Sequence, residues 1–164
     1  MQPARLLFVC LSIAFFGLVA CKKDADPTPA PTLYERLGKV DGIAKVVDKF
    51  MANVGAECAQ PNSVLLRSHA EFLTDVGSGN DFRRVALRNN LIDQFGSADV
   101  SGGPLAYKGK SMLEAHRRMN LTDAEFDAVT VQLVAALDYY QVKEADKAAL
   151  LSVLGQMRGQ IVGH

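Results

Sequence analysis

Apolar residues spaced three and four positions apart constrain the fold of this chain more than any other feature of its sequence. Ile43, Val46, Val47, Phe50 and Val54 follow this spacing, and the same period recurs in later segments. Strands would instead need strict alternation of apolar and polar residues, which is almost absent after residue 32. The pattern therefore predicts an all-α fold in which each helix buries one face.

Capping residues and helix breakers predict where the helices begin and end. In the first half of the domain we expect a short helical turn at 33–37, a helix from Asp41 to about residue 54, a helical turn within 63–73 and a helix from Asp81 to Gly96. In the second half we expect a short helix capped by Ser111, a long helix capped by Thr122 and a last helix that begins at about Ala145. Thr122 and Glu125 have the spacing of a capping box. Residues 97–109 are expected to hold no helix, because Gly102, Gly103 and Pro104 break it in succession.

The first 32 residues carry a different pattern. Arg5 precedes an apolar run at 6–19 that is short for a membrane span and typical of an export signal. The run ends at Cys21 in a sequence that resembles the bacterial lipobox, so we expect a signal peptide at 1–20 and a lipid on Cys21; an ordinary secretory signal cut after Ala20 is the alternative. Residues 21–32 would then be the lipidated cysteine and a proline-rich spacer, and 33–164 a single domain at the cell envelope or in the periplasm.

Charge and cysteine content argue against two classes of protein, those that bind nucleic acids and those held together by disulfides. The chain has 18 basic and 18 acidic residues, with no basic patch interleaved with aromatics, so we expect no nucleic-acid partner. If Cys10 leaves with the signal and Cys21 carries lipid, Cys58 has no partner for a disulfide. We expect Cys58, in an alanine-rich segment, to be a small buried apolar residue; a reactive thiol is the alternative.

His116 is the residue that most needs a chemical explanation. It lies in the apolar stripe formed by Met112, Ala115 and Met119, and an imidazole facing a core must find a partner. It is either a core histidine bonded to a carbonyl, or a metal ligand through Nε2 with Nδ1–H on the helix backbone. No second ligand has a spacing that would complete a zinc site. A metal held by one side chain needs a group such as a porphyrin to supply its other ligands.

Several motifs in order resemble the group I truncated haemoglobins. They are Leu33-Tyr34-Glu35-Arg36-Leu37-Gly38, Val46-Val47-Asp48-Lys49-Phe50, Gly102-Gly103-Pro104, Tyr107-Lys108-Gly109-Lys110-Ser111-Met112, Ala115-His116 and Leu121-Thr122-Asp123-Ala124-Glu125-Phe126. The resemblance implies a two-over-two helical sandwich around haem b, with His116 as the proximal iron ligand. It also implies binding of oxygen or another diatomic gas, such as NO or CO.

Further haem contacts are implied by the same resemblance, although each residue also fits an ordinary core role. Phe50 matches an aromatic near the haem, Leu87, Leu91 and Phe95 match positions facing the gas, and Phe72 is a weaker match because the segment before Asp81 is longer here. The full set of expected contacts is Phe50, Met51, Phe72, Leu87, Leu91, Phe95, Tyr107, Met112, Leu133 and His116.

The chain departs from the family on the gas-binding side. Members that hold oxygen tightly usually have a tyrosine after the residue matching Phe50 and glutamines on the distal helix, where this chain has Met51, Leu87 and Leu91. We therefore expect weak oxygen retention, with Gln94 as the nearest donor.

Two alternatives remain open. Met51 as a second iron ligand would favour electron transfer with an envelope redox partner. A helical lipoprotein interaction module without haem would need His116 only as a core residue. We expect no enzymatic activity, unless the chain carries out haem-dependent chemistry on NO or oxygen.

Overall fold

The structure is a computed structural model that describes residues 29–164. The predicted signal peptide at 1–20, the predicted lipidation site Cys21 and the spacer as far as residue 28 lie outside the described residues. No helix within 29–164 is both long enough and apolar enough to cross a membrane.

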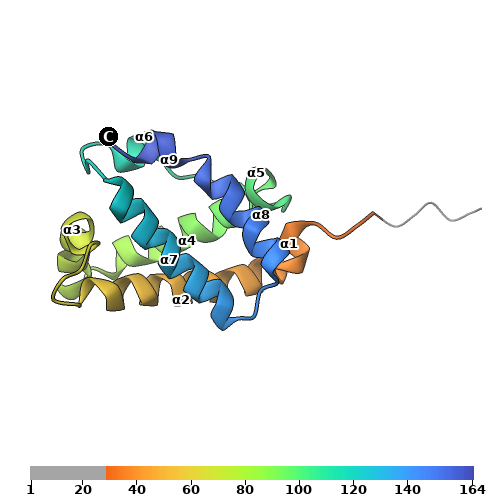
Figure 1. Cartoon of the computed structure of the whole chain (residues 1–164), viewed down its shortest axis with the longest axis horizontal. Helices are drawn as coiled ribbons and strands as arrows, with labels where there is room; N and C mark the ends of the chain where they lie inside the picture. The colour runs from red at the N-terminus through yellow and green to blue at the C-terminus, as the bar shows by residue number, and fades with distance from the viewer. Residues whose placement is uncertain (1–28) are drawn as a thin grey trace, which may run out of the picture.

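Helices make up the described chain, and no strand occurs within it, which confirms the predicted all-α fold (Figure 1). The helices are α1 (Leu33–Arg36), α2 (Lys39–Cys58), α3 (Leu66–Gly77), α4 (Asp81–Phe95), α5 (Ala98–Ser101), α6 (Met112–His116), α7 (Asp123–Tyr139), α8 (Glu144–Gly155) and α9 (Arg158–Ile161). Isolated bridges join Ser97 to Leu105 and Leu121 to Val162.

Helix α2 is the centre of the packing. It contacts α7 and α4 along its length, while α8 packs on α1, α5 and α7, and α6 lies beside α9 (Figure 1). The largest fully buried side chains come from α2, α7, α8 and the residue before α3: Ile43, Val47, Leu65, Leu137 and Leu150. The spacing of three and four residues along α2 therefore faces this core, as predicted.

The start of α2 differs from the prediction. The helix begins at Lys39 after Gly38, whose φ of 86° lies in the left-handed region that glycine adopts without strain. Asp41 is not the cap; it lies in the first turn, where its carboxylate interacts favourably with the positive end of the helix dipole. The prediction was wrong because a glycine cap leaves no polar side chain to mark the helix start.

Residues 97–109 do contain a helix, contrary to the prediction. The Ser97 hydroxyl accepts a hydrogen bond from the Val100 N–H at 3.3 Å and caps α5. Gly102, with φ of 70°, ends that helix. The glycines and Pro104 therefore stop a short helix that precedes them, and do not prevent it from forming.

Other boundaries are closer to expectation. Helix α4 covers Asp81–Phe95, and Ser111 and Thr122 each cap the helix predicted for them. Helix α3 runs to Gly77, four residues beyond the expected turn, and the last predicted helix is divided into α8 and α9. Cys58 is buried as predicted, and burial raises the pKa of its thiol, which therefore stays protonated.

Candidate functional site

Local capping places His116 at the end of a five-residue helix. The Ser111 hydroxyl accepts from the Glu114 N–H, and the Glu114 carboxylate accepts from the Ser111 N–H, so both ends of this capping box are satisfied. His116 is the last residue of α6 and is half-buried. Five residues cannot form a stable helix alone, so neighbouring elements must support α6.

The backbone of α6 holds the His116 ring. Its Nδ1 lies 2.7 Å from the carbonyl oxygen of Met112, one turn earlier. A carbonyl only accepts, so this distance assigns the proton to Nδ1 and leaves the Nε2 lone pair for another partner. Nε2 has no hydrogen-bond partner within residues 29–164. An imidazole prepared in this way suits coordination of one metal ion through Nε2.

A second histidine, His69, has the same local geometry, so this geometry alone does not identify a metal-binding residue. Its Nδ1 lies 3.0 Å from the Leu65 carbonyl oxygen, also one turn earlier, and 3.1 Å from the Ser68 hydroxyl. His69 belongs to α3, and no motif of the sequence surrounds it. His69 is therefore a matched comparison for His116, because both rings are fixed by the same type of bond.

Half of the expected haem contacts meet in the core cluster. Phe50, Phe95 and Leu133 are buried there, and Met51 and Leu91 are partly buried against it. They come from α2, α4 and α7, so three helices contribute to one apolar wall. These side chains are suited to exclude water from a flat apolar ligand.

The other expected contacts lie outside the core cluster of the described residues. Leu87 is 38% exposed. Phe72 has the guanidinium of Arg83 5.7 Å from the centre of its ring. The Tyr107 hydroxyl donates to the Lys110 carbonyl at 2.7 Å, and burial raises the pKa of this phenol. Met112 and His116 are half-buried on α6. The structure therefore brings only part of the predicted set together.

A hollow on the surface lies elsewhere. It has a volume of about 390 Å³ and is lined by residues of α1, the start of α2 and the loop after α5: Thr32, Tyr34, Glu35, Lys39, Gly102, Gly103 and Pro104. It contains none of the residues predicted for the site. A second space, of about 10 Å³, lies among core side chains that include Phe95 and is too small for a ligand.

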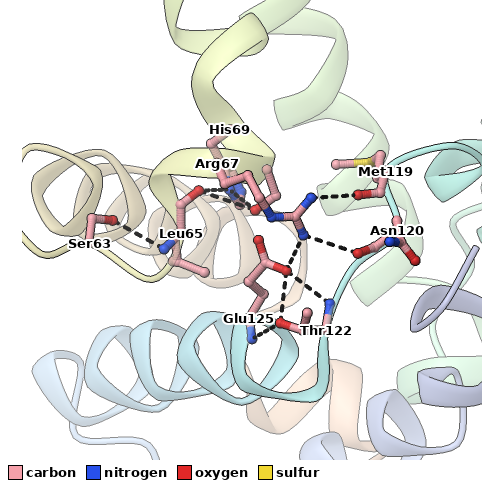
Figure 2. A network of polar contacts seen from close by, with 9 residues as sticks. Ser63, Leu65, Arg67, His69, Met119, Asn120, Thr122 and Glu125 are labelled. Carbon is pink, nitrogen blue, oxygen red and sulfur yellow. Dashed lines mark hydrogen bonds and ion pairs between the residues drawn. The ribbon is translucent and has the colours of Figure 1, made fainter.

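A polar network that the sequence did not predict joins α3 to Met119 and Asn120 after α6 and to Glu125 of α7 (Figure 2). The Arg67 guanidinium donates to the carbonyls of Met119 and Asn120 and to the carboxylate of Glu125. Glu125 was predicted as a member of a capping box, and the box with Thr122 is present. Nothing in the sequence near Arg67 indicated its role, because its partners lie 52 to 58 positions away.

Comparison with known proteins identifies the fold. Residues 32–162 match the family model described as bacterial-like globin. The chain belongs to the bacterial-like globin family. Its helical arrangement is the two-over-two truncated globin fold, which confirms the predicted fold class and the resemblance to truncated haemoglobins.

Relatives of this globin include two named group 1 truncated hemoglobins. The one from Tetrahymena pyriformis is 40% identical over 133 residues, covering 80% of this chain and 95% of the relative. The one from Nostoc sp. is 27% identical over 131 residues, covering 80% of this chain and 97% of the relative.

Two solved structures have the same architecture. The Fe(III) form of the Tetrahymena pyriformis truncated hemoglobin superposes with a TM-score of 0.61 and 27% identity, over 82% of this chain and all of that one. The 2/2 hemoglobin of Synechococcus, solved in the cyanomet state with covalently attached heme, superposes with a TM-score of 0.59 and 23% identity, over 82% of this chain and all of that one.

Proposed function

We propose that this globin binds haem b through His116 and binds a diatomic gas, oxygen or NO or CO, on the opposite side of the haem. The observation that carries the proposal is the His116 ring, whose Nδ1–H donates to the Met112 carbonyl while Nε2 is left without a hydrogen-bond partner in the described residues. The sequence motifs around His116 resemble those around the proximal ligand of truncated haemoglobins. The haem iron, when bound, supplies the site where a diatomic gas coordinates. The residues of this chain supply orientation and exclusion of water.

Two groups of residues have the chemistry that a porphyrin needs. The Met112 carbonyl accepts the Nδ1–H of His116, which orients the ring and leaves Nε2 for the iron. Phe50, Met51 and Leu91, with the core around them, would provide apolar contact to the ring. A porphyrin is large, flat and mostly apolar, so this combination of one imidazole and an apolar wall suits it.

Weak retention of oxygen is part of the proposal. A donor near the gas stabilises the charge that oxygen takes on when it coordinates, whereas CO depends on a donor much less. Met51, Leu87 and Leu91 carry no N–H or O–H group on their side chains. The gas side of this globin therefore favours rapid release of oxygen.

We also propose that the globin works at the cell envelope, anchored through a lipid on Cys21. The support is the sequence alone: an apolar run at 6–19 that ends in a lipobox-like segment. Replacement of Cys21 by serine should abolish incorporation of labelled fatty acid and move the protein from the membrane fraction to the soluble fraction. Unchanged incorporation in the Cys21→Ser variant would refute the anchor.

Absorption spectra of the full chain, purified in detergent from cells supplied with haem, test the central proposal. We expect a strong Soret band in the ferric and ferrous forms and a shifted band under CO. A colourless protein that takes up no added haem would refute the proposal and favour the alternative of a helical interaction module.

Replacement of His116 by glycine tests the ligand assignment. The variant should lose the wild-type spectrum, and imidazole added to the solution should restore it by occupying the place of the missing ring. His69→Gly is the matched control, since His69 makes the same bond to the carbonyl one turn earlier. If His69→Gly changed the spectrum and His116→Gly did not, the assignment would be wrong.

A further inference from the structure

The chain turns sharply directly after His116. We call residues 117–122 the His116 turn. Within it, Arg118 and Asn120 have φ of 73° and 46°, in the left-handed region. Asparagine tolerates this conformation and arginine does so at a cost, so contacts from outside must hold the turn in place.

Arg67 holds the His116 turn from the side of α3 (Figure 2). Its Nη1 donates to the carbonyl of Met119 at 3.1 Å, and its Nη2 donates to the carbonyl of Asn120 at 3.0 Å. A planar guanidinium that donates to two successive carbonyls fixes both the distance and the direction of the backbone. Since α3 packs on α2 and α4, Arg67 connects the turn after His116 to the helices on the other side of the fold.

The same guanidinium also reaches a buried carboxylate. Glu125 is 3% exposed, and its Oε2 accepts from Arg67, from the Thr122 N–H at 2.9 Å and from the Thr122 hydroxyl at 2.9 Å. Its Oε1 is buried with no hydrogen-bond partner in the described part of the chain. Burial by itself would raise the pKa of Glu125, but the bonds from Thr122 and Arg67 outweigh it and hold the pKa below its usual value.

The C-terminal residues support the His116 turn from another side. The Asn120 N–H donates to the His164 carbonyl, and the Gly163 N–H donates to the Leu121 carbonyl at 2.9 Å. These C-terminal bonds are made by the backbone, whereas Arg67 holds the turn through its side chain. A substitution at Arg67 can therefore remove its bonds without changing the backbone on either side.

We propose that Arg67 is a positioning residue that fixes the His116 turn and thereby sets the strength of the bond between His116 and the haem iron. The inference rests on the proposed haem function. Met112 orients the ring relative to α6, and Arg67 orients the His116 turn, which follows α6, relative to α3 and α7. Groups that orient a metal ligand from outside typically change affinity about 10- to 100-fold when removed.

The holoprotein provides the test. Arg67→Met keeps an unbranched stem about as long as the aliphatic part of arginine and removes the donors, and Arg67→Lys keeps the charge with a single donor group. We expect haem transfer to a scavenging globin to become about 10-fold faster or more in Arg67→Met, with Arg67→Lys in between. The iron–histidine stretching band of the ferrous protein should shift or broaden in the same order.

Arg36→Met is the matched control. Arg36 also joins a buried carboxylate, that of Asp146 at 2.7 Å, to a backbone carbonyl, that of Pro31 at 2.5 Å, but it does so between α1 and α8. We expect this variant to lose stability without changing the iron–histidine band or haem transfer. Hydrogen exchange of the apoprotein should show faster exchange at Met119 and Asn120 in Arg67→Met only.

The outcomes separate this inference from the proposed function. If wild type takes up no haem, the proposed function fails and the inference fails with it. If wild type takes up haem, and Arg67→Met and Arg67→Lys match Arg36→Met in haem transfer and in the iron–histidine band, only the role of Arg67 is refuted. If one of the two Arg67 variants does not fold, the other is compared with Arg36→Met on its own.

Discussion

Glu125 is the capping carboxylate whose removal should cost this globin the most. Thr122 donates to it as in any capping box, but Glu125 is also buried and bonded to Arg67. In the box of Thr32 and Glu35, by contrast, the carboxylate is exposed. Since both boxes have the same local pattern, comparing them isolates the effect of burial and of the arginine.

The magnitude follows from the contacts. Loss of the two bonds that the Thr122 N–H and hydroxyl donate to the same oxygen costs about 1 kcal/mol in total. Loss of the bond from Arg67 adds about 1 kcal/mol and not the 1.5 to 3 usual for a charged partner, because Arg67 is 55% exposed and solvent screens the pair. The cavity left by the side chain brings the total for Glu125→Ala to about 2 to 3 kcal/mol. Glu35→Ala should cost less than about 1 kcal/mol.

Urea denaturation of the apoprotein, followed by far-ultraviolet circular dichroism, measures both variants. The free energy of unfolding should fall at least twice as far in Glu125→Ala as in Glu35→Ala, with unchanged dependence on urea concentration. Equal losses in the two variants would show that the buried bond to Arg67 contributes nothing to stability, and the reasoning would be wrong.

Three further predictions concern the gas site, acid stability and the loop before α6. Leu91→Gln places a donor on the predicted gas side, next to the core, and should slow oxygen dissociation about 10-fold, measured by stopped flow. CO dissociation should change little, and equal effects on both gases would contradict the donor argument. Because the pKa of Glu125 lies below its usual 4.5, the stability that its ionised form contributes is present above pH 4.5 and is lost as pH falls through the lowered value. Acid titration should therefore show a smaller loss of stability in Arg67→Met than in wild type. Parallel titration curves for the two proteins would exclude the Glu125–Arg67 pair as the cause. Gly103→Ala puts a Cβ 2.3 Å from the Gly96 carbonyl oxygen and 2.5 Å from the Tyr34 ring, and should cost about 1 to 3 kcal/mol by thermal unfolding, whereas Gly155→Ala, with nothing within 4 Å, should be neutral.

Local signals explain what could be predicted from the sequence. The caps at Ser111 and Thr122 act within four residues, so the starts of α6 and α7 were predicted correctly. The apolar period of α2 identified Val47 and Phe50 as core residues for the same reason. Helix α5 was missed because Gly102, Gly103 and Pro104 were taken to exclude a helix from the whole segment, whereas Ser97 caps a four-residue helix that ends before them.

The role of Arg67 could not be predicted, for a different physical reason. Its partners are backbone carbonyls and a carboxylate more than 50 positions away, and backbone carbonyls are present at every residue of every sequence. Only the path of the chain brings them within reach. Similarly, the sequence placed Leu87, Tyr107 and Met112 in a common site by resemblance, whereas the core cluster of the described residues contains none of the three.

The backbone pairing of residues 162–164 with the His116 turn makes the two ends of the described chain unequal for protein engineering. A purification tag or fluorescent fusion joined after His164 would start at a carbonyl that accepts from Asn120, four residues after the proposed iron ligand. Residues 29–30 are exposed and precede α1, which lies well away from α6 (Figure 1). Tags and surface-coupling groups therefore belong ahead of α1, where they leave the histidine undisturbed.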